Sequence, residues 1–290
     1  MKKKRNMTTL LLVVVILAGL SLLLYPSVSN FINSRNQSRV ISDYNYVLST
    51  GKGEDYARMI SHANAYNQDL LTRDTPYALT PELQSRYDAL LDLSSNGVMG
   101  YVEIPCIDCL LPVYHGTEED VLQYAAGHVD WSSLPVGGES THCIISGHRG
   151  LPTAELMTHI DRLRIGDRFY LNVLGQQLEY QVDQIKVVLP DDLTYLGIEE
   201  GLDLVTLVTC TPYGINSHRL LVRGTRMENG RPASGQLFLT NETEPVSLIY
   251  LLPVSLLLLT AVCFLFWGIR HLLKPLRKEK HHGTSHPTTV

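Results

Sequence analysis

Cysteine is scarce in this chain, with five residues among 290. The pair Cys106 and Cys109, in "IPCIDCLLPVYHG", has no second pair of Cys or His at zinc-site spacing, so the sequence predicts no metal centre, and nothing in it suggests a cofactor. The residues around this pair predict a strand, in which residues three apart face opposite sides. We therefore expect two small packing side chains here rather than a redox disulfide.

Basic charge is scarce outside the two ends of the chain. The formal net charge is −5, and because residues 1–5 and 270–290 contribute +4 each, the middle carries −13. A nucleic-acid-binding domain needs a basic surface, so the sequence argues against that class of function. Internal repeats and low-complexity tracts are also lacking, and a length of 290 residues allows one or two ordinary domains.

Two long uncharged runs stand out from this background. Residues 8–25 follow a basic tail (1–7) and are long enough to cross a bilayer core of roughly 30 Å. Residues 246–268 are longer and precede a second basic tail (269–290). We predict that both runs are transmembrane helices. The alternatives for the first run are an uncleaved signal and a cleaved signal peptide, and the alternative for the second run is a buried core helix.

The basic residues lie on the outer side of each run. By the positive-inside rule, both termini are cytoplasmic and residues 26–245 lie outside the cell membrane. The basic ends are expected to lie against anionic membrane lipid. An odd cysteine count in an exported protein then leaves at least one thiol without a disulfide partner.

Residues 26–96 are predicted to be an extracytoplasmic helical region. Apolar residues recur there at three- and four-residue steps, from Tyr44 to Tyr66. Pro76 and Pro81 interrupt this pattern. Thr80 before Pro81 is typical of a helix start, so we expect a second helix there.

Residues 97–228 consist of short β-rich runs separated by turns, such as "VMGYVEIP", "HCIISGH", "DLVTLVTC" and "RLLVRGTRM". Gly175 marks the expected tip of a hairpin. Many short strands with few helices predict a mainly β domain, a closed barrel or a sandwich. "TAELMTHIDRL" (153–163) is the one helix expected inside it, and the polar residues 229–245 read as a linker.

Cys210 ends the apolar run "TLVTC". A thiol attacks as a thiolate, and an ordinary cysteine pKa of about 8.5 leaves few thiolates at neutral pH, so a partner is needed. His148 in "SGHRG" ends a strand in a glycine-bounded turn and can project into a cleft, whereas His142 and His159 are expected within a strand and a helix. A surface loop histidine is the alternative interpretation of His148.

Arg219 begins the strand that follows Cys210. Neighbouring antiparallel strands can bring the two side chains to the same end, where a cation stabilises the oxyanion formed when a thiolate attacks a carbonyl. A solvated arginine at a strand end is the alternative. The hypothesis of a thiol enzyme depends on the set of three residues.

"TLVTC" at 206–210 resembles the Thr-Leu-x-Thr-Cys motif of sortases. "HRGLP" at 148–152 and "TCTPYGINSHRLLVRG" at 209–224 resemble the class C, pilin-polymerising branch, in which a second, C-terminal membrane helix is also typical. The resemblance extends from about Gly97 to Arg226. It implies a sortase-type closed β-barrel with Cys210 as nucleophile, His148 as acid/base and Arg219 as stabiliser of the carbonyl or oxyanion.

The resemblance also implies the reaction and its partners. A sortase cleaves an LPxTG-like sorting signal between Thr and Gly through a cysteine thioacyl intermediate, and class C enzymes pass the acyl group to a lysine amine of a pilin subunit. The alternatives are a sortase that attaches surface proteins to cell-wall peptide, and a thiol hydrolase. From another class, a two-anchor binding or structural protein would perform no chemistry.

Class C sortases usually carry a lid, with Asp-Pro-aromatic over the cysteine. The nearest match lies within residues 72–80 and consists of Asp74, Thr75, Pro76 and Tyr77, with an extra threonine between Asp and Pro. The resemblance implies that Asp74 pairs with Arg219 and that Tyr77 packs near Cys210. A solvated turn between two helices is the alternative.

Overall fold

The computed structural model describes residues 2–73, 77–227 and Thr260. The chain divides into two compact units, residues 1–236 and 237–290, and apart from Thr260 the described residues belong to the first. The predicted linker, second apolar run and C-terminal tail therefore lie outside the described residues, with the exception of Thr260 in the second apolar run.

Helix α1 (Lys2–Thr50) contains the first apolar run. Its segment Leu10–Thr50 is the one helix among the described residues that is long and apolar enough to cross a membrane, and its most apolar window is unburied. Leu22 and Leu23 are 77% and 74% exposed. Apolar side chains that face outward all round a helix suit contact with lipid, so the first predicted span has the required helix.

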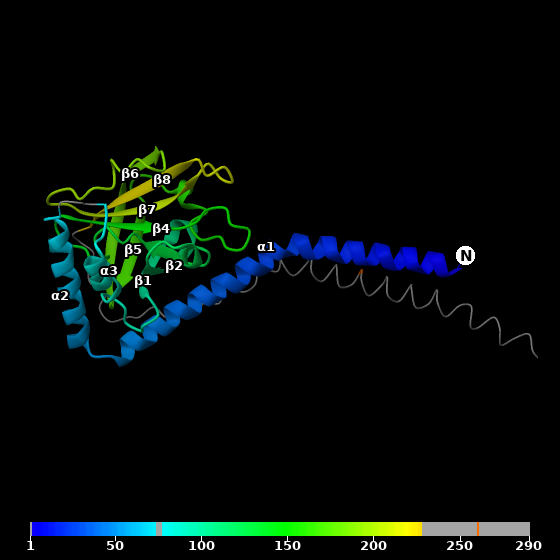
Figure 1. Cartoon of the computed structure of the whole chain (residues 1–290), viewed down its shortest axis with the longest axis horizontal. Helices are drawn as coiled ribbons and strands as arrows, with labels where there is room; N and C mark the ends of the chain where they lie inside the picture. The colour runs from blue at the N-terminus through cyan, green and yellow to red at the C-terminus, as the bar shows by residue number, and fades with distance from the viewer. Residues whose placement is uncertain (1, 74–76, 228–259, 261–290) are drawn as a thin grey trace, which may run out of the picture. The chain divides into compact units, whose positions relative to one another are not determined.

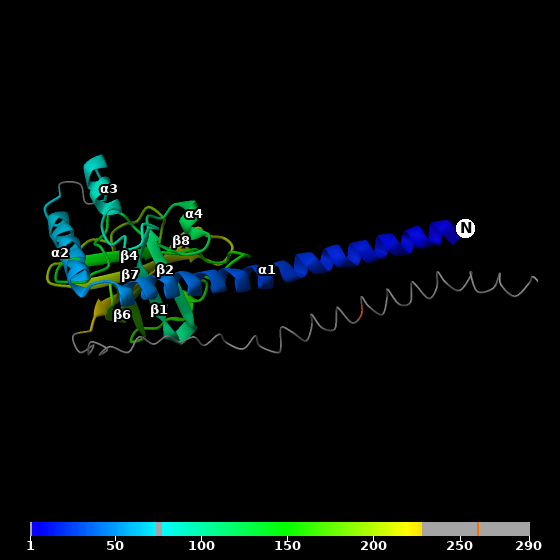
Figure 2. The ribbon, with the colours of Figure 1, turned by 90° about the horizontal axis from the view of Figure 1, so that it is seen from below.

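The carboxyl-terminal part of α1 packs against the strands β1 (Val98–Ile104) and β2 (Cys109–His115) (Figure 2). Tyr44 is buried there, and its hydroxyl donates to the Met99 carbonyl and accepts from the Leu174 N–H, both at 2.9 Å. The helix that carries the apolar run is therefore joined directly to the β domain.

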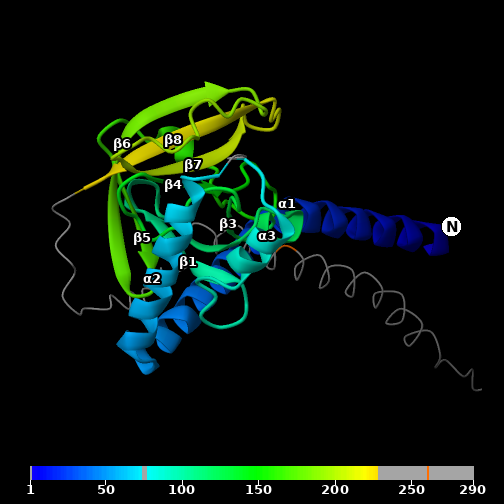
Figure 3. The same cartoon turned by 60° about the vertical axis from the view of Figure 1, so that its left-hand side comes forward.

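Helices α2 (Gly53–Leu70) and α3 (Pro81–Asp88) cover one side of the β domain (Figure 3). The buried side chain of Asn67 on α2 bonds both the N–H and the carbonyl of Leu134. The predicted helix start is confirmed: the Thr80 hydroxyl accepts from the Leu83 N–H, and Pro81 occupies the first turn of α3.

Eight strands form a closed barrel in the order β1-β2-β3-β4-β7-β8-β6-β5 (Figure 1). This confirms the prediction of a mainly β domain and selects the barrel over the sandwich. Besides β1 and β2, the strands are β3 (Ala126–His128), β4 (Thr141–Ser146), β5 (Arg168–Val173), β6 (Gln176–Val188), β7 (Asp203–Thr211) and β8 (His218–Arg226).

Alternate residues of the strands fill the barrel interior. Val102, Ile145, Val205 and Val222 are fully buried in one hydrophobic cluster. The intervening side chains of β4, β7 and β8 face outward, because successive residues of a strand point to opposite faces.

Residues 153–163 correct one prediction. They form turns and a short 3₁₀ helix (Ile160–Arg162) in place of the expected α-helix. Leu156 has φ = 41°, in the left-handed region that interrupts an α-helix, and its side chain joins Met157 and Ile160 in the barrel core. Packing against the barrel has overridden the helical periodicity.

The Cys106–Cys109 segment corrects another prediction. Cys106 is exposed in a 3₁₀ turn (Pro105–Ile107) between β1 and β2, and only Cys109 is a buried strand residue. Asp108, at φ = 50°, makes the sharp reversal between the two strands.

Candidate active site

Strands β7 and β8 place two of the three predicted residues at one end of the barrel. Cys210 is the penultimate residue of β7, and its partner in the strand register is Arg219 on β8. Residues directly opposite each other on antiparallel strands point to the same face, with Cα atoms about 4.5–5.5 Å apart. The Cys210 and Arg219 side chains are therefore neighbours.

His148 reaches the same end of the barrel from β4. Strand β4 runs parallel to β7, with Ser146 opposite Val208, and the Gly147 N–H continues the ladder by donating to the Val208 carbonyl at 3.0 Å. Two residues further along both segments, the same register places His148 beside Cys210. Adjacent strands are about 4.8 Å apart, so the backbone register places all three predicted positions at one end of the barrel.

All three positions belong to the outer face of the barrel. Leu207 of β7 and Leu220 of β8 lie in the interior cluster, and alternation turns Cys210 and Arg219 outward. Cys210 is half-buried. A peptide that approaches from outside therefore meets a thiol, an imidazole and a guanidinium on one surface.

The other described thiols are poorly suited to act as nucleophiles. Burial raises the pKa of Cys109 to about 12 and that of Cys143 well above the usual range, so both are protonated at neutral pH. Cys106 is exposed, but partial burial and the nearby Asp167 raise its pKa. Cys210 is the described cysteine that is accessible and has an arginine, Arg219, as its cross-strand partner.

His148 has an acidic neighbour that the sequence reasoning missed. Its Nε2 lies 3.4 Å from a carboxylate oxygen of Glu119, at the start of the short helix α4 (Glu119–Leu122). The His148 side chain is 25% exposed and that of Glu119 is 69% exposed, so this contact is solvated. Glu119 lies 29 residues before His148, and no local pattern in the sequence connects them.

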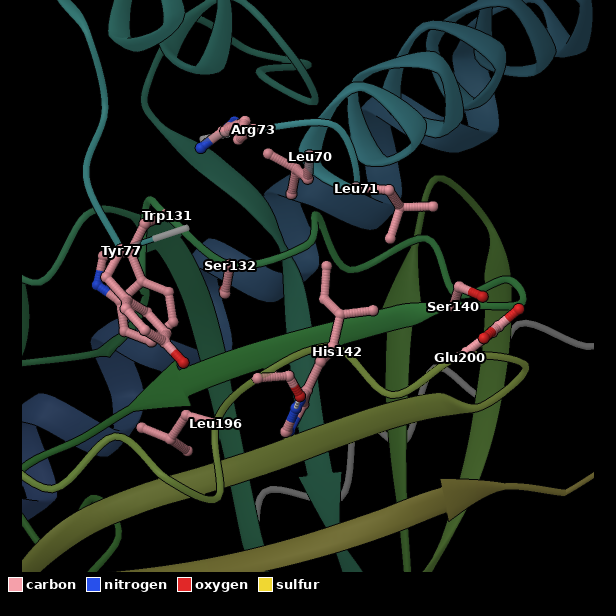
Figure 4. A pocket seen from close by; sticks show the side chains of 12 residues that line it. Leu70, Leu71, Arg73, Tyr77, Trp131, Ser132, Ser140, His142, Leu196 and Glu200 are labelled. Carbon is pink, nitrogen blue, oxygen red and sulfur yellow. Dashed lines mark hydrogen bonds between the residues drawn. The ribbon is translucent and has the colours of Figure 1, made fainter. Parts of the chain in front are cut away.

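A cavity of about 560 Å³ opens elsewhere on the outer face (Figure 4). It is lined by Leu70 and Leu71 at the end of α2, Trp131 after β3, Leu196 before β7, and His142 of β4. His142 stands near the start of β4, whereas His148 follows its end. None of the three predicted site residues, Cys210, His148 and Arg219, lines this cavity.

His142 anchors one wall of this cavity. Its Nδ1 lies 2.7 Å from the Gly197 carbonyl oxygen and its Nε2 lies 2.7 Å from the Thr206 hydroxyl. Burial lowers the pKa of His142, so the neutral ring donates to Gly197 and accepts from Thr206. The loop between β6 and β7 is thereby fixed to the sheet.

One of the predicted lid residues, Tyr77, lines this cavity. Tyr77 is 41% exposed, and its ring meets that of Trp131 edge to face, with centroids 5.1 Å apart. Asp74 and Pro76 lie outside the described residues. The expected contacts of the lid with Cys210 and Arg219 stay predictions.

The family model described as "Sortase domain" matches residues 102–227. The chain is similar to the crystal structure of sortase C1 from Streptococcus agalactiae, with 47% identity, a TM-score of 0.64, and coverage of 66% of this chain and 99% of that one.

Two further structures give similar values. Sortase C of Streptococcus pneumoniae, described with regard to catalysis and pilin substrate specificity, is 46% identical, with a TM-score of 0.61 and coverage of 67% of this chain and 99% of that one. Sortase C of Clostridium perfringens, with a C-terminal cell wall sorting motif, is 43% identical, with a TM-score of 0.57 and coverage of 66% and 98%.

Proposed function

Because the chain belongs to the sortase family of cysteine transpeptidases, we propose that it is a class C enzyme that polymerises pilins. Its donor substrate is a protein with an LPxTG-like sorting signal, and its acceptor is a lysine amine of a pilin subunit. The observation that carries the proposal is the cross-strand pairing of Cys210 with Arg219, together with the parallel pairing of β4 and β7, since His148 follows the end of β4 at the same end of the barrel.

The three side chains divide the chemistry as follows. The thiol of Cys210 gives its proton to His148, and the thiolate attacks the carbonyl carbon of the Thr–Gly bond. Arg219 stabilises the negative charge that develops on the carbonyl oxygen. His148 then protonates the departing glycine amine, which leaves a thioester on Cys210.

The second half of the reaction reverses these roles. The lysine amine attacks the thioester carbonyl and loses a proton to His148, and the Cys210 thiolate departs. An isopeptide bond replaces the thioester, and the proton returns to the thiol. Water must lose the competition for the thioester, or the enzyme becomes a hydrolase.

The choice of acceptor is supported by the relatives. Three solved structures that resemble the chain are sortases C, and one of them is described with regard to pilin substrate specificity. Attachment of surface proteins to cell-wall peptide is the alternative, with the same donor half-reaction.

We infer a membrane topology consistent with this chemistry. The run 8–25 within α1 is the first anchor, and residues 246–268 form a second, with the tails 1–7 and 269–290 in the cytoplasm. Residues 26–96 and the barrel, 97–228, then act outside the membrane, followed by the linker 229–245. The exposed leucines of α1 support the first anchor.

A polymerisation assay tests the function. Full-length enzyme in liposomes is incubated with a pilin subunit that carries an LPxTG signal and a reactive lysine. We expect covalent ladders on denaturing gels, and their absence with Cys210→Ala. Cleaved monomer without ladders would contradict pilin polymerisation, and multimers formed by Cys210→Ala would contradict the thiol mechanism.

The segment 72–80 is proposed as a lid over the site. Asp74→Ala combined with Tyr77→Ala should then raise the rate at which a small alkylating reagent labels Cys210. Tyr46→Ala, which removes an exposed tyrosine from α1, is the matched control. Equal labelling rates in the wild type and the double variant would contradict the lid.

A further inference from the structure

Two hydrogen bonds join the loop that carries His148 to β7, one from the residue before His148 and one from the residue after it. Before His148, the Gly147 carbonyl accepts a hydrogen bond of 2.7 Å from the hydroxyl of Thr209, which is 2% exposed. After His148, Nη1 of Arg149 donates to the Thr211 hydroxyl at 3.3 Å. Residues 147 and 149 thus bond residues 209 and 211, with His148 and Cys210 between them.

Arg149 is held in an enclosed environment. Its side chain is only 9% exposed, and its Nη2 donates to a carboxylate oxygen of Asp161 at 2.5 Å. Its guanidinium carbon lies 5.9 Å from the ring centroid of Tyr213, in the loop between β7 and β8. Arg149 therefore connects the His148 loop, the 3₁₀ turn of Asp161 and the loop that follows Cys210.

This arrangement fits a geometric role better than a stabilising one. The Asp161 side chain is 43% exposed, and an ion pair open to solvent contributes little net stability because water screens the charge attraction. What an apolar side chain cannot supply is a planar fork that donates in two fixed directions. Lysine would keep the charge near Asp161 but could not make both bonds in the same geometry.

We propose that Arg149 is a positioning residue that holds His148 opposite Cys210. The inference rests on the proposed function, since it acts through the roles assigned there to these two residues. Proton transfer and thiolate attack require near-contact geometry, and a displacement of about 1 Å can lower a rate by about 10²-fold. The Arg149 side chain is 9% exposed and offers little surface to a substrate, so the loss should appear in kcat more than in KM.

The test uses the full-length enzyme in detergent and a fluorescent LPxTG peptide. Arg149→Met should lower kcat by about 10- to 100-fold with KM changed less than about threefold, and Arg149→Lys should recover part of the loss. Asp161→Asn should lower kcat in the same direction by a smaller factor. Arg162→Met, at an exposed arginine next to Asp161, is the matched control and should keep the wild-type kcat.

Thermal unfolding of each variant separates positioning from folding. An unfolding midpoint of Arg149→Met close to that of the wild type, together with the fall in kcat, supports positioning. A wild-type kcat in Arg149→Met, or a loss that only matches the unfolded fraction, would overturn it.

Cys210→Ala separates this inference from the proposed function. If Cys210→Ala still cleaves the peptide, the proposed function fails. If Cys210→Ala is inactive while Arg149→Met keeps its kcat, the proposed function stands and the role of Arg149 is refuted.

Discussion

Acidification from pH 7 to pH 4 should remove a definable part of the stability of the barrel, through His128. This side chain is fully buried; its Nδ1 lies 3.0 Å from the Tyr87 hydroxyl and its Nε2 lies 2.8 Å from the Ser133 carbonyl oxygen. A carbonyl oxygen only accepts, so the neutral ring carries its proton on Nε2. Burial lowers the pKa of His128 to about 4.

The sign and size of the effect follow from linkage. An unfolded chain takes up a proton on His128 near pH 6.5, whereas the folded chain does so only near pH 4. Between these values the unfolded state binds more protons, so stability is complete above pH 6.5 and is lost as the pH falls toward 4. A difference of about 2.5 pH units at 1.36 kcal/mol each gives about 3 kcal/mol.

Buried carboxyl groups act in the opposite direction. Burial raises the pKa values of Asp203, Asp130 and Glu103 in the folded protein, so their contribution falls as the pH rises through those raised values. The contribution of His128 must therefore be measured as a difference between two proteins.

Denaturant unfolding of the full chain in detergent, followed by tryptophan fluorescence, supplies that difference. His128→Gln keeps a donor for the Ser133 carbonyl but cannot titrate. The stability of the wild type relative to this variant should fall by about 3 kcal/mol between pH 7 and pH 4. His62→Gln, on the exposed surface of α2, controls for the loss of one imidazole. A constant difference between wild type and His128→Gln would refute the reasoning.

Three further predictions concern the site and the barrel. His148→Ala should slow single-turnover cleavage of a labelled sorting-signal peptide by about 10²- to 10⁴-fold, because the leaving amine loses its proton donor; an unchanged rate would exclude that role. In the same assay the cleavage rate of Arg219→Ala should be about 10²-fold below that of the wild type, and the rate of Arg219→Lys should fall less. Equal rates in the two variants would show that the positive charge contributes nothing to the rate. Gly100→Ala would bring a Cβ to 2.3 Å from the Asn172 carbonyl oxygen of β5, so denaturant titration should show a loss of about 3 kcal/mol, against less than about 1 kcal/mol for Gly53→Ala, which has open space.

Features set by short-range chemistry were predictable from the sequence. The Gly175 turn is one: Leu174 and Gly175 have φ values of 48° and 80° and join β5 to β6 as a two-residue hairpin. The Thr80 cap of α3 is another. In each case a few adjacent residues determine the backbone, so no tertiary information was needed.

The site could be predicted in part. Cys210 and Arg219 lie nine positions apart across one hairpin, so their pairing follows from local topology. The approach of His148 depends on parallel pairing between β4 and β7, which are about 60 residues apart in the chain. The residue pattern alone leaves open the alternative that His148 is a surface loop histidine. The family resemblance is what assigns His148 the role of acid/base.

The rest depends on packing that a linear pattern does not contain. Residues 153–163 have helical periodicity but form turns because their apolar side chains fill the barrel. Strand β3 has three residues, too few for a period-two signal. The contacts of Glu119 and Arg149 join segments that meet only after the barrel closes.

Mass spectrometry of the enzyme trapped during turnover tests the central claim most directly. After brief mixing with an LPxTG peptide and acid quench, the peptide that contains Cys210 should carry the acyl fragment ending in threonine, as a hydroxylamine-sensitive thioester. His148→Ala should carry little of it. Acyl label on Cys106, Cys109 or Cys143, or turnover without any label on Cys210, would contradict the account.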